Sequence, residues 1–202
     1  MELILSIALG AFIMYGVFMA KGAKRDYYTK RKAFADHFIE RLKHLGYFEY
    51  ADSENVKHLQ KALVISFLND EGLAFIQDKQ NGLPLDFRLY EISGKELAAA
   101  GAGNYLKKLK PAFERMRVPL IQKELLFDAM QPARMIAELV VFLNKHFESA
   151  GAKERVFVIG DPENAKIIFL TKAQQSYIST VIKNGNLQPM ELKAWAKWNR
   201  LI

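Results

Sequence analysis

The chain has 202 residues, of which half are hydrophobic and a quarter are charged, and this balance excludes a wholly disordered protein. It contains no cysteine, which excludes disulfides, thiolate metal sites, iron–sulfur clusters and a cysteine nucleophile. The net charge is +7, but residues 21–32 alone carry +5, so residues 33–202 are only mildly basic at +3. This distribution suits a membrane surface better than a nucleic-acid groove, and no nucleic-acid partner is expected.

The first segment is an apolar run of 18 residues, 3–20, without a formal charge. As a helix it would be roughly 27 Å long, close to the hydrocarbon thickness of a bilayer. We therefore expect a transmembrane anchor over residues 1–20, a basic juxtamembrane segment over 21–32, and one folded domain over 33–202. The alternatives are a buried core helix, which usually shows a polar stripe, and a cleaved signal peptide, which normally has its basic residues in front.

Basic residues follow the apolar run directly, and this asymmetry predicts the orientation of the anchor. Lysine and arginine stay on the cytoplasmic side of a single span. We expect a single-pass membrane protein with its N-terminus outside and its domain in the cytoplasm, in contact with the lipid bilayer. The side chains expected at the membrane surface are Lys21, Lys24, Arg25, Lys30, Arg31 and Lys32.

Within the apolar run, Ser6 and Gly10 form a pair of small residues four positions apart. Such spacing lets two membrane helices approach closely, so it is compatible with a homo-oligomer. The simpler interpretation is that serine and glycine are common in membrane helices.

Two helices are predicted next. Phe34, Phe38 and Leu42 recur at helical spacing within residues 28–45, and Gly46 is a plausible end. A second helix is expected from Asp52 or Ser53 to about Leu68.

A hairpin is then predicted from strands at 73–77 and 86–92, separated by the turn signal Asn81-Gly82. Ser93 and Glu96 resemble a capping box that opens a short helix, which we expect the segment 98–103 to break.

Asn104 is a plausible cap for a further helix to Met116, kinked or restarted at Pro111. A strand is expected over 118–127, and a helix from Pro132 to about Ala150.

A second hairpin is predicted from strands at 155–159 and 166–170. Thr171 and Gln174 form another capping-box pattern, opening a helix to about Lys183. A final helix is expected to begin at Pro189. This element order predicts an α+β fold with a mainly antiparallel sheet, built from two hairpins, and with helices on one face.

No recognisable motif carries chemistry. Gly101-Ala102-Gly103 lacks both the third glycine and the preceding strand of a dinucleotide fingerprint. The four histidines show no zinc-binding spacing. We therefore assign no catalytic, cofactor-binding or metal-binding residue, and expect no cofactor.

Trp195 and Trp198 lie three positions apart, with Lys193, Lys197 and Arg200 as neighbours. Aromatic rings with basic neighbours are typical of a partner-binding or membrane-touching helix, whereas the alternative is that one ring packs in the core. Together these features favour a membrane-tethered protein-interaction or regulatory module with a protein partner at the membrane. The alternative is an enzyme whose active site is assembled from dispersed residues.

Overall fold

The computed structural model describes residues 25–70, 72–73, 88–121 and 131–202. The expected anchor, with Ser6 and Gly10, lies outside this part of the chain, as do Lys21 and Lys24 of the basic segment. Among the helices that are described, none has the length and apolar character needed to cross a membrane.

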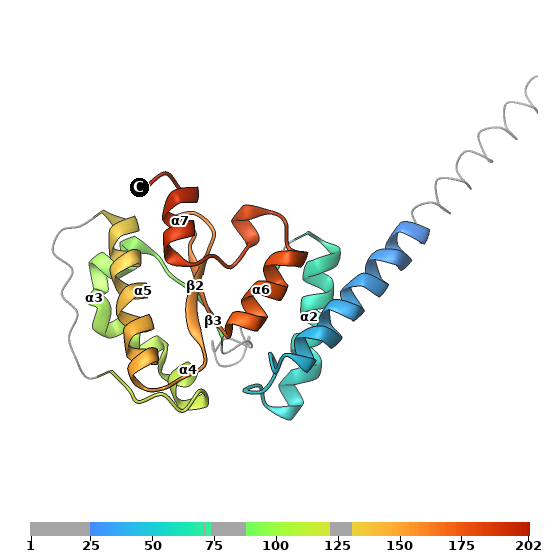
Figure 1. Ribbon diagram of the computed structural model, residues 1–202, viewed down its shortest axis with the longest axis horizontal. Coiled ribbons are helices and arrows are strands. Elements are labelled where there is room, and N and C mark those ends of the chain that lie inside the picture. The colour runs from blue at the N-terminus through green and yellow to red at the C-terminus, as the bar shows by residue number, and fades with distance from the viewer. Residues whose placement is uncertain (1–24, 71, 74–87, 122–130) are drawn as a thin grey trace, which may run out of the picture.

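A three-stranded antiparallel sheet forms the centre of the described structure (Figure 1). Its strands are β1 (Leu89–Glu91), β2 (Arg155–Ile159) and β3 (Lys166–Leu170), in the order β1-β3-β2. The β2–β3 hairpin follows the sequence prediction, and its register places Phe157 opposite Ile168. β1 pairs with β3 on the other side, Leu89 opposite Ile168.

Helices cover both faces of this sheet, so the expectation of helices on one face was wrong (Figure 1). β2 and β3 are apolar at nearly every position, RVFVI and KIIFL, and all but the first residue of each strand is buried. A strand that is apolar on both sides has two faces to bury. The sequence pattern thus already favoured three layers over two.

One core lies between the sheet and α3 (Gly94–Lys108), α4 (Lys110–Arg115), α5 (Pro132–Ser149) and α7 (Leu192–Trp198). We name it the α5-side core. From the sheet it receives alternate side chains, as the two-residue period of a strand requires. These are Tyr90, Val156, Val158, Ile167 and Phe169.

The opposite core, the α6-side core, lies between the sheet and the helix over residues 25–44, α2 (Ser53–Leu68) and α6 (Lys172–Val181). The sheet contributes the remaining alternate positions to it, Leu89, Phe157, Ile159, Ile168 and Leu170. α6 begins with the predicted capping box, in which Thr171 Oγ1 accepts from the Gln174 amide and Gln174 Oε1 accepts from the Thr171 amide.

The predicted break at residues 98–103 does not occur, because α3 is continuous from Gly94 to Lys108. The alanines in this stretch have the highest helix propensity, which outweighs the cost of glycine. Asn104 is therefore interior to α3, and Ser93 makes no side-chain cap. A new helix, α4, begins next to Pro111, as a restart at this proline predicts.

Other predicted strands are shorter or missing. β1 starts at Leu89, and its partner is β3; residues 74–87, with most of the expected first hairpin, lie outside the described residues. Residues 118–121 form no strand, and 122–127 are also outside the described part. α7 begins at Leu192 rather than Pro189, because Met190 is used in a β-bridge to Val158.

The outer edge of β2 is closed by two different devices. The backbone of Val158 exchanges hydrogen bonds of 2.9 and 2.8 Å with Met190. The backbone of Val156 is bound by the side chain of Asn144 on α5, which accepts from its N–H at 2.7 Å and donates to its carbonyl at 3.1 Å. An edge strand capped in this way cannot add a further strand there.

Candidate functional site

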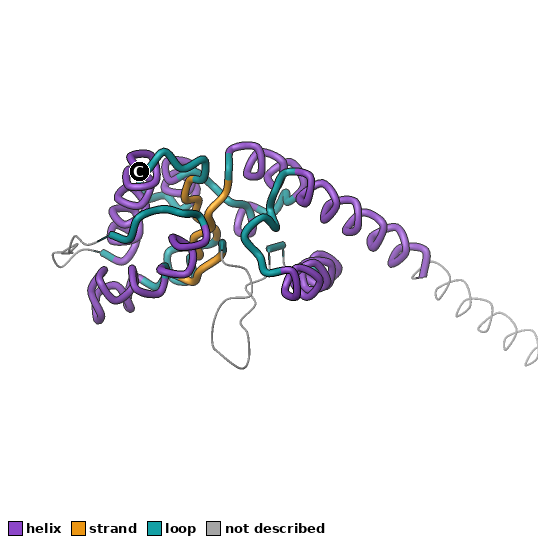
Figure 2. The backbone as a smooth tube through the Cα atoms, turned by 90° about the horizontal axis from the view of Figure 1, so that it is seen from below, coloured by secondary structure: helices purple, strands orange, loops and turns teal. Residues whose placement is uncertain are grey.

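The helix over residues 25–44 projects beyond the body of the domain (Figure 2). Residues 25–34, which we name the stalk, are exposed apart from the half-buried Arg31. From Ala35 onward the same helix enters the α6-side core through Phe38 and Leu42. Ten helical residues rise about 15 Å. The described part of the basic segment, residues 25–32, therefore belongs to the same helix that is anchored in the core.

A pocket of about 610 Å³ lies where the stalk meets the domain. We name it the stalk groove. Its walls come from one face of the stalk, the end of α2 and the segment that follows α6. The residues used below are Tyr27, Lys30, Arg31, Phe34, Phe67, Asp70 and Lys183. Tyr27 and Phe34 are 60% and 52% exposed, so aromatic surface is presented here to solvent.

Arg31 fixes the geometry of the stalk groove. Its guanidinium donates to the Phe67 carbonyl at 2.9 Å, to the Tyr27 hydroxyl at 2.5 Å, and to the Asp70 carboxylate. The hydrogen bonds with Asp70 and Tyr27 raise the pKa of Arg31 above its ordinary value. A cation at the C-terminal carbonyls of α2 also interacts favourably with the helix dipole. Arg31 therefore joins the stalk to α2.

The expected membrane-surface residues thus have different surroundings. Arg31 is turned toward the domain, and Lys32 pairs with Asp36 at 3.1 Å. Arg25 and Lys30 are exposed, and Lys30 has no ion-pair partner among the described residues. Contact with a membrane remains a prediction for all of them.

A second pocket, of about 720 Å³, lies between α6, the segment 183–191 and α7. We name it the C-terminal groove. Trp198 forms part of its wall, is 56% exposed, and donates from Nε1 to Asn186 Oδ1 at 3.2 Å. Lys183, Lys197 and Arg200 also line it, together with Glu191. Lys183 belongs to both grooves.

Trp195 differs from Trp198 in its exposure to solvent. It is fully buried in the α5-side core, where its Nε1 donates to the Gly160 carbonyl at 2.7 Å. A partner has no access to this ring. The alternative given by the sequence, that one of the two tryptophan rings packs in the core, therefore holds for Trp195. Of the expected pair, only Trp198 is placed at a surface.

A third pocket, of about 430 Å³, is polar and lies at the turn after residues 25–44. Arg115 binds both carboxylate oxygens of Asp52 at 2.5 and 2.7 Å, and this interaction holds the pKa of Asp52 below its ordinary value. Lys153 pairs with Glu49 at 3.0 Å. Two of the three basic side chains that line this pocket, Arg115 and Lys153, therefore have an acidic partner, whereas Arg117 has no ion-pair partner among the described residues.

The conformations at the helix ends mark all three pockets. Gly46 and Gly151 follow helices with a positive φ, as is usual at this position. Three charged residues adopt the same conformation, Asp70, Arg117 and Arg200, with φ of 61°, 56° and 56°. Each of them lines one pocket. The conformation is strained for the two arginines, and strain beside a pocket motivates a hypothesis of function there that the sequence pattern alone did not suggest.

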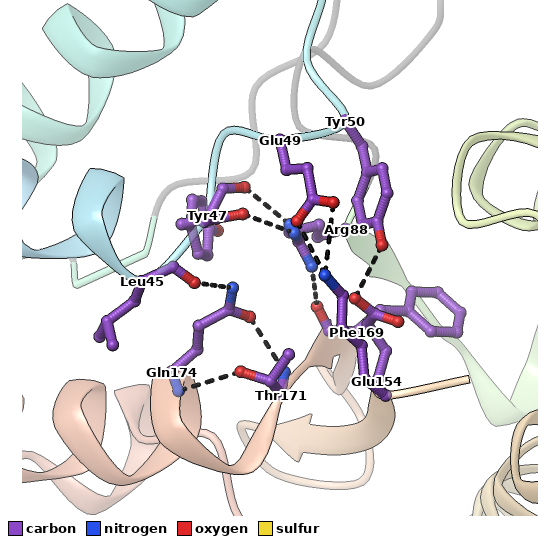
Figure 3. Close-up of polar contacts among 11 residues, drawn as sticks. Leu45, Tyr47, Glu49, Tyr50, Arg88, Glu154, Phe169, Thr171 and Gln174 are labelled. Carbon is purple, nitrogen blue, oxygen red and sulfur yellow. Dashed lines mark hydrogen bonds and ion pairs between the residues drawn. The ribbon is translucent and has the colours of Figure 1, made fainter. Parts of the chain in front are cut away.

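A buried arginine, Arg88, holds the turn after residues 25–44 onto the sheet (Figure 3). Its guanidinium donates to the carbonyls of Tyr47, Phe169 and Gly46 at 2.8, 3.1 and 3.1 Å. Its charge also lies 4.7 Å from the centre of the Tyr50 ring. The sequence analysis placed Arg88 within a predicted strand over residues 86–92 and did not identify it as buried.

Tyr50 completes this cluster by donating to Glu154 Oε1 at 2.9 Å (Figure 3). Burial, followed by that hydrogen bond, raises the pKa of Tyr50 well above its ordinary value. The phenol is therefore held neutral as a hydrogen-bond donor. The cluster connects three distant segments of the chain and is structural in character.

Among the described residues, no group of three or more histidine, aspartate or glutamate side chains converges on one point. His146, for example, makes a 2.7 Å contact between its Nε2 and the Pro119 carbonyl.

Comparison with protein-family models, with curated proteins and with solved structures gives no match for this chain.

Proposed function

We propose that this protein is a membrane-tethered module that binds a protein partner at the cytoplasmic face of a membrane through the stalk groove. The observation that carries the proposal is the position of this groove: one wall is the stalk, which includes part of the basic segment, and the other is the folded domain. A site placed there lies on the part of the domain nearest to the expected anchor.

The composition of the stalk groove supports a protein partner. Aromatic side chains and arginine are enriched in interfaces, and the groove contains Tyr27, Phe34 and Arg31. Arg31 is already held by Phe67 and Asp70, so binding costs little loss of its rotamer freedom. A tether raises the effective concentration of such a site relative to a partner in the same membrane, so a weak interface suffices.

The tether is tested by cell fractionation of the full chain. Wild type is expected to pellet with membranes and to resist alkaline washing. Leu9→Arg places a charge in the middle of the apolar run, at a cost of roughly 3 kcal/mol for insertion, and is expected to move the protein into the soluble fraction. Leu120→Arg, at a half-exposed position of the domain, is the control and should stay with the membrane. A soluble wild type would overturn the tether.

The groove is tested by a photo-crosslinking phenylalanine analogue at Phe34 in native membranes. We expect a single cross-linked product, and we expect its yield to fall in the Lys30→Glu variant. The control places the same analogue at Val141, exposed on α5 and remote from the groove, and should give no such adduct. Equal yields of cross-linked product from both positions would contradict a specific partner.

The orientation of the anchor is tested separately, by a reporter protein fused to the C-terminus.

A further inference from the structure

We propose that the C-terminal groove is a second binding site, and that its ligand is an acidic segment of a protein chain. This inference does not depend on the membrane tether or on the stalk groove. It rests on charge, on the placement of one tryptophan, and on one strained arginine, all of which meet in a single pocket of about 720 Å³.

Charge is the first observation. Lys183, Lys197 and Arg200 line the groove, and none of them has a carboxylate within ion-pair distance among the described residues. Glu191 is the acidic residue of the same lining, so the groove keeps an excess of two positive charges. Elsewhere in the described structure, basic side chains of Arg31, Arg115 and Lys153 pair with acids of the chain itself.

The placement of Trp198 is the second observation. Its ring lies so close to Gly185 that any side chain at position 185 would collide with it, and its Nε1 is bound to Asn186. The indole is therefore held in one orientation while more than half of the side chain stays exposed. A rigid, exposed tryptophan is the type of residue that dominates binding energies at interfaces.

The conformation of Arg200 is the third observation. It follows the last turn of α7 with φ of 56°, and its N–H and that of Leu201 bind the carbonyls of Lys197 and Ala196 at 3.1 and 2.9 Å. Glycine usually occupies this position because other residues are strained there. Arginine at this position adds a guanidinium group to the rim of the groove, whereas glycine would avoid the strain but add no charge.

The amide side chains that line the groove already have hydrogen-bond partners within the protein, which limits the groups that a ligand can bind. Gln188 Nε2 donates to the carbonyls of Ser179 and Ile182, and Gln175 Nε2 donates to the Pro189 carbonyl. The β-bridge between Met190 and Val158 closes the neighbouring strand edge. A ligand must therefore be recognised by the basic side chains and by the indole of Trp198. This combination suits a peptide in which acidic side chains flank an apolar one.

The experiment measures binding of a short fluorescent peptide, glutamates around a central leucine, to the full chain in a zwitterionic detergent. Saturable binding that weakens with salt is expected. Arg200→Glu and Lys197→Glu should each weaken it about tenfold or more. The matched control is Lys193→Glu, which reverses a charge on the same helix outside the groove and should change the affinity less than about twofold.

A further variant separates binding from folding. Arg200→Gly relieves the backbone strain, so it should raise the thermal unfolding temperature while it weakens peptide binding. The proposal is overturned if the peptide does not bind, if Lys193→Glu weakens binding as much as Arg200→Glu, or if the groove variants reduce binding to anionic lipid vesicles but leave the peptide affinity unchanged.

Discussion

Arg88 shows how much one buried side chain can hold together in this protein. Its guanidinium satisfies three carbonyls, of Gly46, Tyr47 and Phe169, and these belong to a turn and a strand far apart in sequence. A planar, permanently charged donor is suited to this task, and the compact ammonium group of lysine is not. The turn between the helix over residues 25–44 and α2 thus depends on a residue near β1.

Removal of this arginine is expected to be severely destabilising. Arg88→Met keeps the apolar stem but removes the guanidinium donor from the carbonyls of Tyr47 and Phe169 and one of the two donors of the Gly46 carbonyl, which also accepts from the Glu49 N–H. The free energy of unfolding should therefore fall by about 3–5 kcal/mol. Arg88→Lys should recover only a small part of this loss. Urea denaturation followed by circular dichroism measures both variants, and a loss below about 1 kcal/mol for Arg88→Met would show that the carbonyls find other donors.

Arg117 is expected to behave in the opposite way. It follows α4 with φ of 56°, where the Val118 N–H binds the Phe113 carbonyl at 2.9 Å. Arg117→Gly should raise the free energy of unfolding by up to about 1 kcal/mol, because glycine adopts this conformation without steric strain. Arg117→Ala removes the same charge and keeps the strain, so it should not stabilise. Thermal unfolding of the two variants side by side decides the point.

Among the elements, those with strong local signals were the ones that the sequence located well. α5 has a proline in its first turn and a regular apolar stripe, and α6 has a capping box whose two hydrogen bonds are both formed. β2 and β3 match the predicted bounds because each is a short apolar run beside a turn. Local chemistry determines these elements before any tertiary contact is considered.

What the sequence did not locate depends on distant contacts. Nothing near residues 89–91 indicates that β1 pairs with β3, some eighty residues later. The grooves are also tertiary: Trp198, Lys197 and Arg200 were recognised as a group, but Lys183 and Gly185 reach them only because the chain folds back after α6. Burial of Trp195 depends likewise on the layer to which α7 packs.

At the same scale, the edge of β2 gives a prediction. Asn144→Leu removes both side-chain hydrogen bonds to the backbone of the buried Val156 and leaves its N–H and C=O unpaired. We therefore expect a loss of about 2 kcal/mol in the free energy of unfolding. The freed edge should also promote self-association, measured by light scattering on heating. The control is Lys145→Leu, an exposed neighbour on α5, which adds the same apolar group without opening the edge.

In the whole molecule, the helix over residues 25–44 belongs to two regions at once. Its second half is part of the α6-side core, whereas its first half, the stalk, has one principal attachment to the domain, through Arg31. We therefore expect the two halves to differ in local stability, because protection from hydrogen exchange follows burial and packing.

Thr29→Pro tests this difference. Proline removes a backbone N–H and clashes with the preceding turn, so hydrogen–deuterium exchange within residues 25–34 should accelerate strongly. Exchange in α5 and the global unfolding midpoint should stay close to wild type. Thr29→Ser, which keeps a hydroxyl able to bind the Arg25 carbonyl, is the control. A matching fall in the global midpoint would mean that the stalk unfolds together with the domain.

Lys183 gives the two grooves a common wall, and this has a thermodynamic consequence. A ligand that draws this ammonium group into one groove withdraws it from the other, so occupancy of the first must change the affinity of the second. The effect is reciprocal and equal in both directions, whichever ligand arrives first. A domain with two adjoining sites of this kind can report to one partner whether another is present.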